Sequence, residues 1–119
     1  MSNTVRFNVD LTIHEGKLDV FRAIAQTMIV ETQKEPGALG YEWHLSRDQK
    51  RCRLLETYTD ADAVLAHMTG PVVQGLVPKL LETASLERFE VYGDPGPKAT
   101  ETLTGIGAEI FYLWRGLNR

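Results

Sequence analysis

The chain has 119 residues, of which 43% are hydrophobic and 24% are charged. That length suits a single domain with one core and leaves no room for a separate cofactor domain. The formal net charge is −3 and the 13 basic residues are scattered. This argues against a nucleic-acid-binding module, in which basic side chains gather along the phosphates. We therefore expect one domain over residues 1–119, with any pocket inside the core or between subunits.

Cys52 is the only cysteine, which excludes an internal disulfide framework and a multi-cysteine zinc site. The first residues are polar and lead directly into an alternating pattern, without the apolar stretch of a signal peptide. No wholly apolar run approaches the roughly 20 residues that cross a bilayer. These features predict a cytoplasmic protein that does not contact a membrane.

The first two elements are predicted by a change of period. Apolar and polar residues alternate strictly from 5 to 13, which predicts a strand with one buried face. From Leu18 onward, apolar residues that include Met28 recur every three or four positions, as in an amphipathic helix. We expect this helix to end near Glu35, where Pro36 and Gly37 interrupt it.

The next segment predicts an antiparallel hairpin followed by helices. Alternating residues over 39–45 and 52–58 flank a short polar loop, which indicates two paired strands. Asp60 then provides an N-cap for a helix over 61–67. A second helical segment over 72–84 contains Pro78, which predicts a kink or a fresh start there.

A fourth strand over 86–92 completes the order β-α-β-β-α-β. A loop rich in Pro and Gly follows, and then a short helix over 98–104 and a strand over 109–114. This order predicts an α+β fold of the ferredoxin-like split βαβ type, with an antiparallel sheet and helices on one face. The core covers about residues 5–92, and residues 93–119 form a C-terminal helix-strand extension.

The other face of the sheet predicts a partner. It carries Asn8, Asp10, Glu42 and His44 beside apolar residues, a mixture that suits neither free solvent nor a dry core. The apolar strand near the C-terminus also favours a partner. We predict a homodimer in which two symmetry-related sheets meet face to face.

Standard motifs for phosphate, flavin and nicotinamide binding are absent, which predicts that no cofactor is bound by the usual devices. The three histidines, His14, His44 and His67, share no ligand spacing, so we expect no metal site. Cys52, alone on a strand, is interpreted as a small buried residue rather than a nucleophile.

Glu56, Tyr58 and His67 form the best candidate for a catalytic site. Glu56 and Tyr58 point to the same side of their strand, and His67 ends the helix that follows. A histidine here could accept a phenolic proton at the mouth of a pocket between the sheet and the helices. The alternative is structural, with His67 stabilising the C-terminus of its helix and Tyr58 in the core.

Aromatic residues on neighbouring strands could enclose a substrate ring. Trp43, Tyr41 and Phe7 are the strand residues concerned, and Met28 is added from the first helix. Alternating aromatic residues are more often part of the core than of a substrate cage. Both interpretations of these four residues remain open at the level of the sequence.

Two segments resemble the antibiotic biosynthesis monooxygenase family. One is Glu35-Pro-Gly-Ala-Leu-Gly-Tyr-Glu-Trp, and the other runs from Leu55-Glu-Thr-Tyr-Thr-Asp through Ala61 to His67. In this family a strand commonly ends Glu-x-aromatic, usually tryptophan, and the next helix ends Ala-His. His67 matches the family histidine and Glu56 the strand glutamate, whereas Tyr58 replaces the usual tryptophan.

The resemblance implies a dimeric α+β barrel and a function like that of the quinol monooxygenases. Its members oxygenate quinols or polycyclic phenols with dioxygen, without metal or flavin, and the deprotonated substrate itself donates the electron. On this basis His67, Tyr58 and Glu56 are the expected catalytic residues, and Trp43 and its neighbours the expected substrate-binding residues. The alternative is a non-catalytic dimeric module that binds a small apolar or aromatic ligand in the same pocket.

Overall fold

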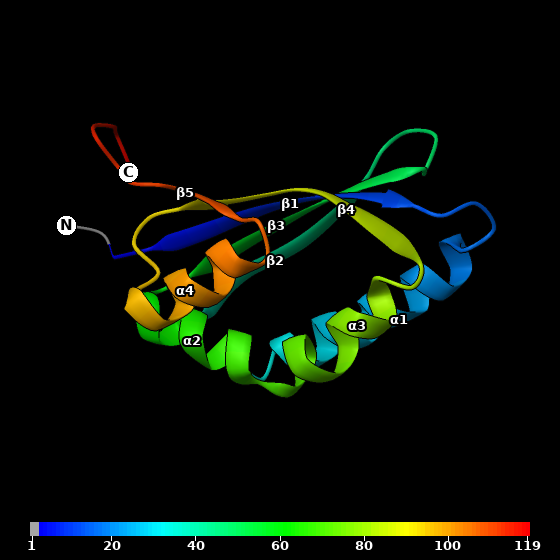
Figure 1. Ribbon diagram of the computed structural model, residues 1–119, viewed down its shortest axis with the longest axis horizontal. Helices are drawn as coiled ribbons and strands as arrows, with labels where there is room; N and C mark the ends of the chain where they lie inside the picture. Colours follow the sequence, from blue (N-terminus) through cyan, green and yellow to red (C-terminus); the bar gives the residue numbers. More distant parts are fainter. Residues whose placement is uncertain (1–2) are drawn as a thin grey trace.

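The computed structural model describes residues 3–119, and its helices all cover one face of a single sheet (Figure 1). The elements in chain order are β1 (Val5–Ile13), α1 (Leu18–Thr32), β2 (Ala38–Leu45), β3 (Arg51–Tyr58), α2 (Ala61–Thr69), the π-helical turn η1 (Val72–Leu76), α3 (Val77–Leu80), β4 (Ala84–Tyr92), α4 (Pro97–Gly105) and β5 (Glu109–Phe111). The α+β ferredoxin-like fold predicted from the element order is confirmed.

The sheet has five strands in the order β2-β3-β1-β4-β5. β1 lies in the middle and pairs antiparallel with both β3 and β4, and β2 and β3 form the predicted hairpin. β5 is the exception, because it pairs parallel to β4. The chain returns to the sheet edge through α4, which provides the crossover that a parallel pair requires. The sheet is therefore mixed, not purely antiparallel.

The alternation of β1 places every second side chain in the core. Val5, Phe7, Val9, Leu11 and Ile13 are all buried beneath the helices. Phe21 and Met28 of α1 belong to the same hydrophobic cluster, as do Cys52, Leu54 and Tyr58 of β3. A period of two in the strands and of three to four in α1 thus brings the two apolar faces together.

Several predicted boundaries differ from the structure. The helical segment predicted over 72–84 ends at Leu80, and the helix predicted over 61–67 continues to Thr69. α1 ends at Thr32 instead of Glu35, and the backbone N–H of Glu35 donates to the carbonyl of Thr32 in a turn that follows the helix. β4 begins at Ala84, two residues earlier than predicted. β5 ends at Phe111 rather than at 114, because only the last three residues of β4 pair with it.

The interruption predicted at Pro78 is confirmed. The π-helical turn η1 gives way to α3 at Val77, and Pro78 lies in the first turn of α3. A proline is tolerated there because the first N–H groups of a helix have no partner inside it. None of the helices over residues 3–119 is both long and apolar enough to cross a membrane.

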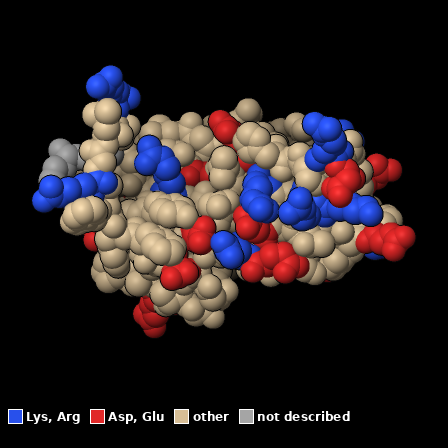
Figure 2. All heavy atoms as spheres, turned by 90° about the horizontal axis from the view of Figure 1, so that it is seen from above, with Lys and Arg blue, Asp and Glu red and all other residues tan. Residues whose placement is uncertain are grey.

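The sheet face away from the helices carries a mixed set of side chains, and Figure 2 views the molecule from that side. Asp10 pairs with Arg53 at 3.1 Å, and the rings of Tyr92 and Phe111 stack at 5.4 Å. Leu55 is 41% exposed on the same face. Acidic, basic and apolar side chains are thus interleaved, as the alternation predicted. We call this surface the open face.

Candidate active site

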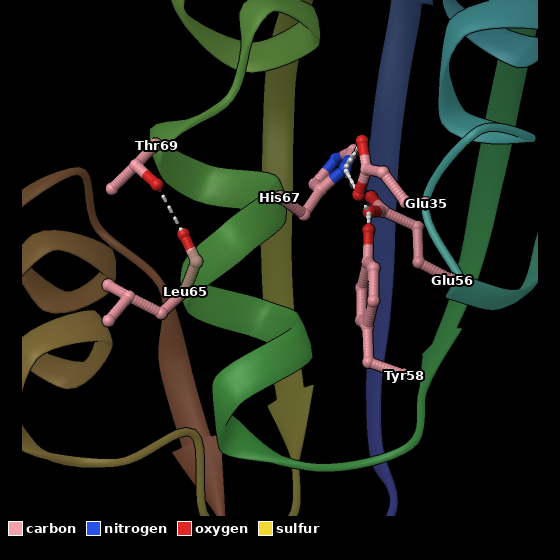
Figure 3. Close-up of polar contacts among 6 residues, drawn as sticks. All are labelled: Glu35, Glu56, Tyr58, Leu65, His67 and Thr69. Carbon is pink, nitrogen blue, oxygen red and sulfur yellow. Dashed lines mark hydrogen bonds and ion pairs between the residues drawn. The ribbon is translucent and has the colours of Figure 1, made fainter. Parts of the chain in front are cut away.

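The three predicted catalytic residues lie together between the sheet and the helices (Figure 3). Glu56 and Tyr58 are two residues apart on β3, so both point to the helix-covered face of the sheet. His67 reaches them from the last turn of α2, whose first turn is capped by Asp60 accepting from the N–H of Ala63. The prediction that these three side chains converge agrees with the structure, whereas their catalytic roles stay predictions.

Direct polar contacts join the three residues. The hydroxyl of Tyr58 donates a hydrogen bond to Oε1 of Glu56. Nε2 of His67 lies 3.6 Å from the same oxygen. The side chains of Glu56 and His67 are only 6% and 4% exposed. The result is a carboxyl, an imidazole and a phenol in contact within the core.

Glu35 completes this cluster, and the sequence analysis did not assign it a role. Its Oε1 and Oε2 lie 3.0 and 3.2 Å from Nδ1 of His67. Glu35 lies in the turn between α1 and β2, where its carbonyl accepts from the N–H of Ala38. The available signal was its place directly before Pro36 and Gly37, at the start of a segment that resembles the family, where it was used to mark the end of a helix and carried no chemical role. We call Glu35, Glu56, Tyr58 and His67 the buried cluster.

Two tyrosine rings contact the imidazole. The ring centroids of Tyr41 and Tyr58 lie 5.7 and 5.2 Å from that of His67. Tyr41 is on β2, directly opposite Glu56, and its ring contacts Trp43 at 5.8 Å. The structure thus brings Tyr41 to the imidazole and Trp43 next to Tyr41, and the substrate-binding role of both residues stays a prediction.

Phe7 and Met28 are part of the hydrophobic core. Phe7 contacts the rings of Tyr58 and Phe89 at 5.3 and 5.2 Å, so it supports the cluster from the central strand. Met28 is buried on α1 among the core residues. Both side chains are 2% exposed. Any contact of either residue with a substrate stays a prediction.

Burial favours the neutral form of each ionisable group in the core of the cluster. It raises the pKa of Glu56 to about 7, an effect that the charge of Glu35 reinforces and the hydroxyl of Tyr58 opposes. Burial lowers the pKa of His67, against the opposing influence of Glu35. It also raises the pKa of both Tyr58 and Tyr41, with the charge of Glu56 adding to the effect. Near neutral pH the cluster therefore contains a neutral imidazole beside a carboxyl that readily holds a proton.

The indole N–H of Trp43 is a buried donor without a hydrogen-bond partner among residues 3–119. Such a donor costs free energy when it is left unsatisfied, so it is a place where an oxygen of a ligand would be favoured. Trp43 lies next to Tyr41, which in turn contacts His67. The donor thus lies beside the aromatic ring that contacts His67.

Glu56, Tyr58 and His67 are enclosed in this structure, since none of them is more than 5% exposed. Two shallow hollows of about 240 and 230 Å³ lie beside the β2–β3 hairpin, and both have Ser46 and Arg51 in their walls. Neither is lined by Glu56, Tyr58 or His67. A ligand therefore reaches the cluster only when side chains around it move.

The described residues offer little support for a metal site or a cysteine nucleophile. Within residues 3–119, no three His, Cys, Asp or Glu side chains are placed so that they could hold a metal ion. Cys52 is buried, and burial raises the pKa of its thiol to about 11. A thiol with so high a pKa is a poor nucleophile near neutral pH, which agrees with its interpretation as a core residue.

The family model described as antibiotic biosynthesis monooxygenase matches residues 4–79. The chain belongs to the antibiotic biosynthesis monooxygenase family. The matched segment contains all four members of the buried cluster as well as Tyr41 and Trp43.

Solved structures show the same fold. MupZ from Pseudomonas fluorescens is 29% identical, with a TM-score of 0.83, and the alignment covers 99% of this chain and 96% of MupZ. SnoaB from Streptomyces nogalater, a cofactor-independent oxygenase, is 18% identical with a TM-score of 0.69, covering 81% of this chain and 97% of SnoaB. A conserved protein from Methanosarcina mazei is 20% identical, with a TM-score of 0.71 and coverage of 76% and 92%. No curated protein matches the chain at a significant level.

Proposed function

We propose that this member of the antibiotic biosynthesis monooxygenase family oxidises a small quinol or polycyclic phenol with dioxygen, without a bound cofactor. The observation that carries the proposal is the imidazole of His67, held neutral and buried between two carboxyl groups and two phenol rings. A neutral imidazole accepts a proton, and its position in a low-dielectric core strengthens its electrostatic interaction with a charged substrate. The description of SnoaB as a cofactor-independent oxygenase supports the reaction class.

The reaction balances without an added reductant. For a substrate with a methylene group beside an aromatic ketone, one CH₂ and one O₂ give one C=O and one H₂O. His67 takes one substrate proton, the resulting anion passes an electron to dioxygen, and the two radicals combine into a peroxide. The remaining C–H bond of the peroxide then gives up its proton, and its electron pair forms the C=O bond as the O–O bond breaks. The departing oxygen takes this proton and the one returned by His67, and leaves as water. The substrate supplies all four electrons.

The substrate ring would enter beside β2. This strand forms an edge of the sheet. Its Tyr41 and Trp43 are only partly buried, whereas Phe7 and Tyr58 are fully buried. Displacement of these two side chains would open a path to His67, and Tyr58 would form the far wall. The free indole N–H of Trp43 would then bind a hydroxyl or carbonyl oxygen of the substrate.

Oxygen consumption tests this function. The wild-type protein is mixed with anthrone or menadiol in buffer that contains a metal chelator, beside the variants His67→Ala and His14→Ala. We expect consumption above the protein-free rate, a loss of about 10²- to 10⁴-fold in His67→Ala, and no loss in His14→Ala. His14 is a suitable control because it is exposed and contacts Ser85, far along the chain from the cluster.

Unchanged turnover in His67→Ala would remove the assigned role of the histidine. Saturable binding of the aromatic compounds without any oxygen consumption would favour the alternative function, a module that binds an apolar or aromatic ligand.

We further propose that the protein is a homodimer whose subunits meet through the open face, which would form the dimeric barrel. The partly exposed Leu55 and the stacked rings of Tyr92 and Phe111 support this, because apolar surface among charged pairs is typical of subunit interfaces. A cytoplasmic location, expected from the single free cysteine, stays a prediction.

A further inference from the structure

Glu35 links the buried cluster to the surface of the protein. Its side chain is 22% exposed, whereas that of His67 is 4% exposed. The neighbouring Lys34 does not neutralise it, because the ammonium of Lys34 pairs with Glu31 at 2.9 Å. The carboxyl group of Glu35 is thus turned toward His67 and keeps some access to water.

The geometry of this contact determines which nitrogen of His67 carries the proton. An ionised carboxylate can only accept hydrogen bonds, so Nδ1 must be the donor at 3.0 and 3.2 Å from the two oxygens of Glu35. A neutral imidazole then has its lone pair on Nε2. That lone pair faces Oε1 of Glu56 at 3.6 Å, toward the interior of the site.

We propose that Glu35 is a positioning residue that holds His67 in the Nδ1–H form and stabilises its imidazolium after Nε2 has accepted the substrate's proton. The catalytic part of this inference rests on the proposed oxygenase function. The proton taken up at Nε2 is returned to the departing water, so Glu35 itself gains and loses none. Glu35 therefore acts through His67 and does not touch the substrate.

Among residues 3–119, the titratable side chains that contact His67 come from three parts of the fold. The titratable groups that face it are Glu35 from the turn after α1, Tyr41 from β2, and Glu56 and Tyr58 from β3. The pKa values of both tyrosines and of Glu56 are raised by burial. Glu35 is thus the group best placed to stabilise a positive charge on His67.

Nitrogen NMR of the full chain with labelled histidine tests the proposal, because the two ring nitrogens have distinct shifts in each tautomer. The signals of the three histidines are assigned with His14→Ala and His44→Ala. We expect wild-type His67 to be neutral with its proton on Nδ1. In Glu35→Gln, which keeps the size of the side chain but removes its charge, the tautomers mix and the titration midpoint of His67 falls. In Glu15→Gln, at an exposed position in the turn before α1, neither quantity changes.

Kinetics of the same proteins supply the second readout. We expect kcat of Glu35→Gln to fall between about 10- and 10⁴-fold with little change in KM, since the substrate is not contacted. Glu15→Gln should keep the wild-type kcat.

A wild-type spectrum with the proton of His67 on Nε2 would overturn the proposal, and this result does not depend on whether a variant folds. An unchanged tautomer and midpoint in Glu35→Gln would also overturn it. If the expected spectra are found but the wild-type protein oxidises no substrate, the proposed oxygenase function fails while the positioning of His67 by Glu35 stands.

Discussion

Gly37 lies so close to Ala63 that a β-carbon at position 37 would be 2.5 Å from that of Ala63. The carbonyl of Gly37 also accepts a hydrogen bond from the N–H of Thr59, just before α2 begins. Ala63 and His67 are four residues apart on α2 and therefore share one face of the helix. The turn that carries Glu35 is thus in direct contact with the helix that carries His67.

The first prediction concerns this contact. Gly37→Ala should lower the free energy of unfolding by about 1–3 kcal/mol, because the added methyl group has no space beside Ala63. Ala63→Gly should restore the space, so the double variant should lose less stability than the sum of the two single variants. Urea unfolding of the four proteins measures this coupling.

Gly105→Ala is the matched control, since an added β-carbon there meets no atom within 4 Å. Its free energy of unfolding should change by less than about 1 kcal/mol. Strict additivity of Gly37→Ala and Ala63→Gly would show that the close approach does not constrain the turn.

The second prediction uses the raised pKa of Glu56. Between the ordinary pKa of 4.5 and the folded-state value of about 7, the folded protein keeps a proton that the unfolded chain has released. The contribution of Glu56 to stability is therefore fully present below about pH 4.5 and is lost as the pH rises through 7. Glu56→Gln, which resembles the protonated side chain, should equal the wild type near pH 5 and exceed its free energy of unfolding by roughly 1–3 kcal/mol at pH 8.

Denaturant unfolding at several pH values measures that difference. His67, whose pKa is lowered, gives the wild type an opposite pH dependence, and the comparison with Glu56→Gln largely cancels it. Glu101→Gln, at an exposed position on α4, is the control, and its free energy of unfolding should change with pH as that of the wild type does. If the stability of Glu56→Gln relative to the wild type falls as the pH rises, Glu56 does not hold a proton in the folded protein.

The third prediction tests the free indole N–H. Trp43→Phe keeps an aromatic ring but removes the donor, so KM should rise by about tenfold, the value of one hydrogen bond to the substrate. Trp114→Phe, at an 85% exposed position, should keep the wild-type KM. Steady-state kinetics with the best substrate of the oxygen assay measure these KM values. Equal KM values in the wild type and Trp43→Phe would exclude a hydrogen bond from the indole N–H to the substrate.

The regular part of the fold could be predicted from the sequence because each element depends on local information. The alternation over Val5–Ile13 gave β1 with its bounds and its buried face. The parallel pairing of β5 could not be found in this way. Its direction depends on where α4 packs, and a strand of three residues has too little pattern to show its partner. The exposed residues after Phe111 were assigned to a strand because they are apolar, yet no neighbouring strand pairs with them.

Part of the site could also be predicted, because three of its residues lie close together in the sequence. Glu56 and Tyr58 share a face by strand periodicity, and His67 follows them closely along the chain. Glu35 is 32 residues away from His67 in sequence, so their contact requires the tertiary packing of the turn against α2. The enclosure of the cluster likewise follows from side-chain packing, which a pattern of residue types does not contain.

The fourth prediction concerns assembly. Sedimentation at micromolar concentration should show a dimer of the 13.4 kDa chain, and Leu55→Lys should convert it to a monomer by placing a charge on the open face. Val20→Lys, at a 50% exposed position on α1, should leave the dimer intact. A wild-type protein that sediments only as a monomer would remove the proposed dimer.

Incorporation of oxygen from ¹⁸O₂ tests the proposed oxygenase reaction most directly. Anthrone, which has the methylene group that the balanced reaction requires, is converted under ¹⁸O₂ in ordinary water, and the product is analysed by mass spectrometry immediately after the reaction. The account predicts one labelled oxygen atom in each product molecule, with the second released as water. A product without label, formed together with an equivalent of hydrogen peroxide, would contradict it and would show simple oxidation of the substrate by dioxygen.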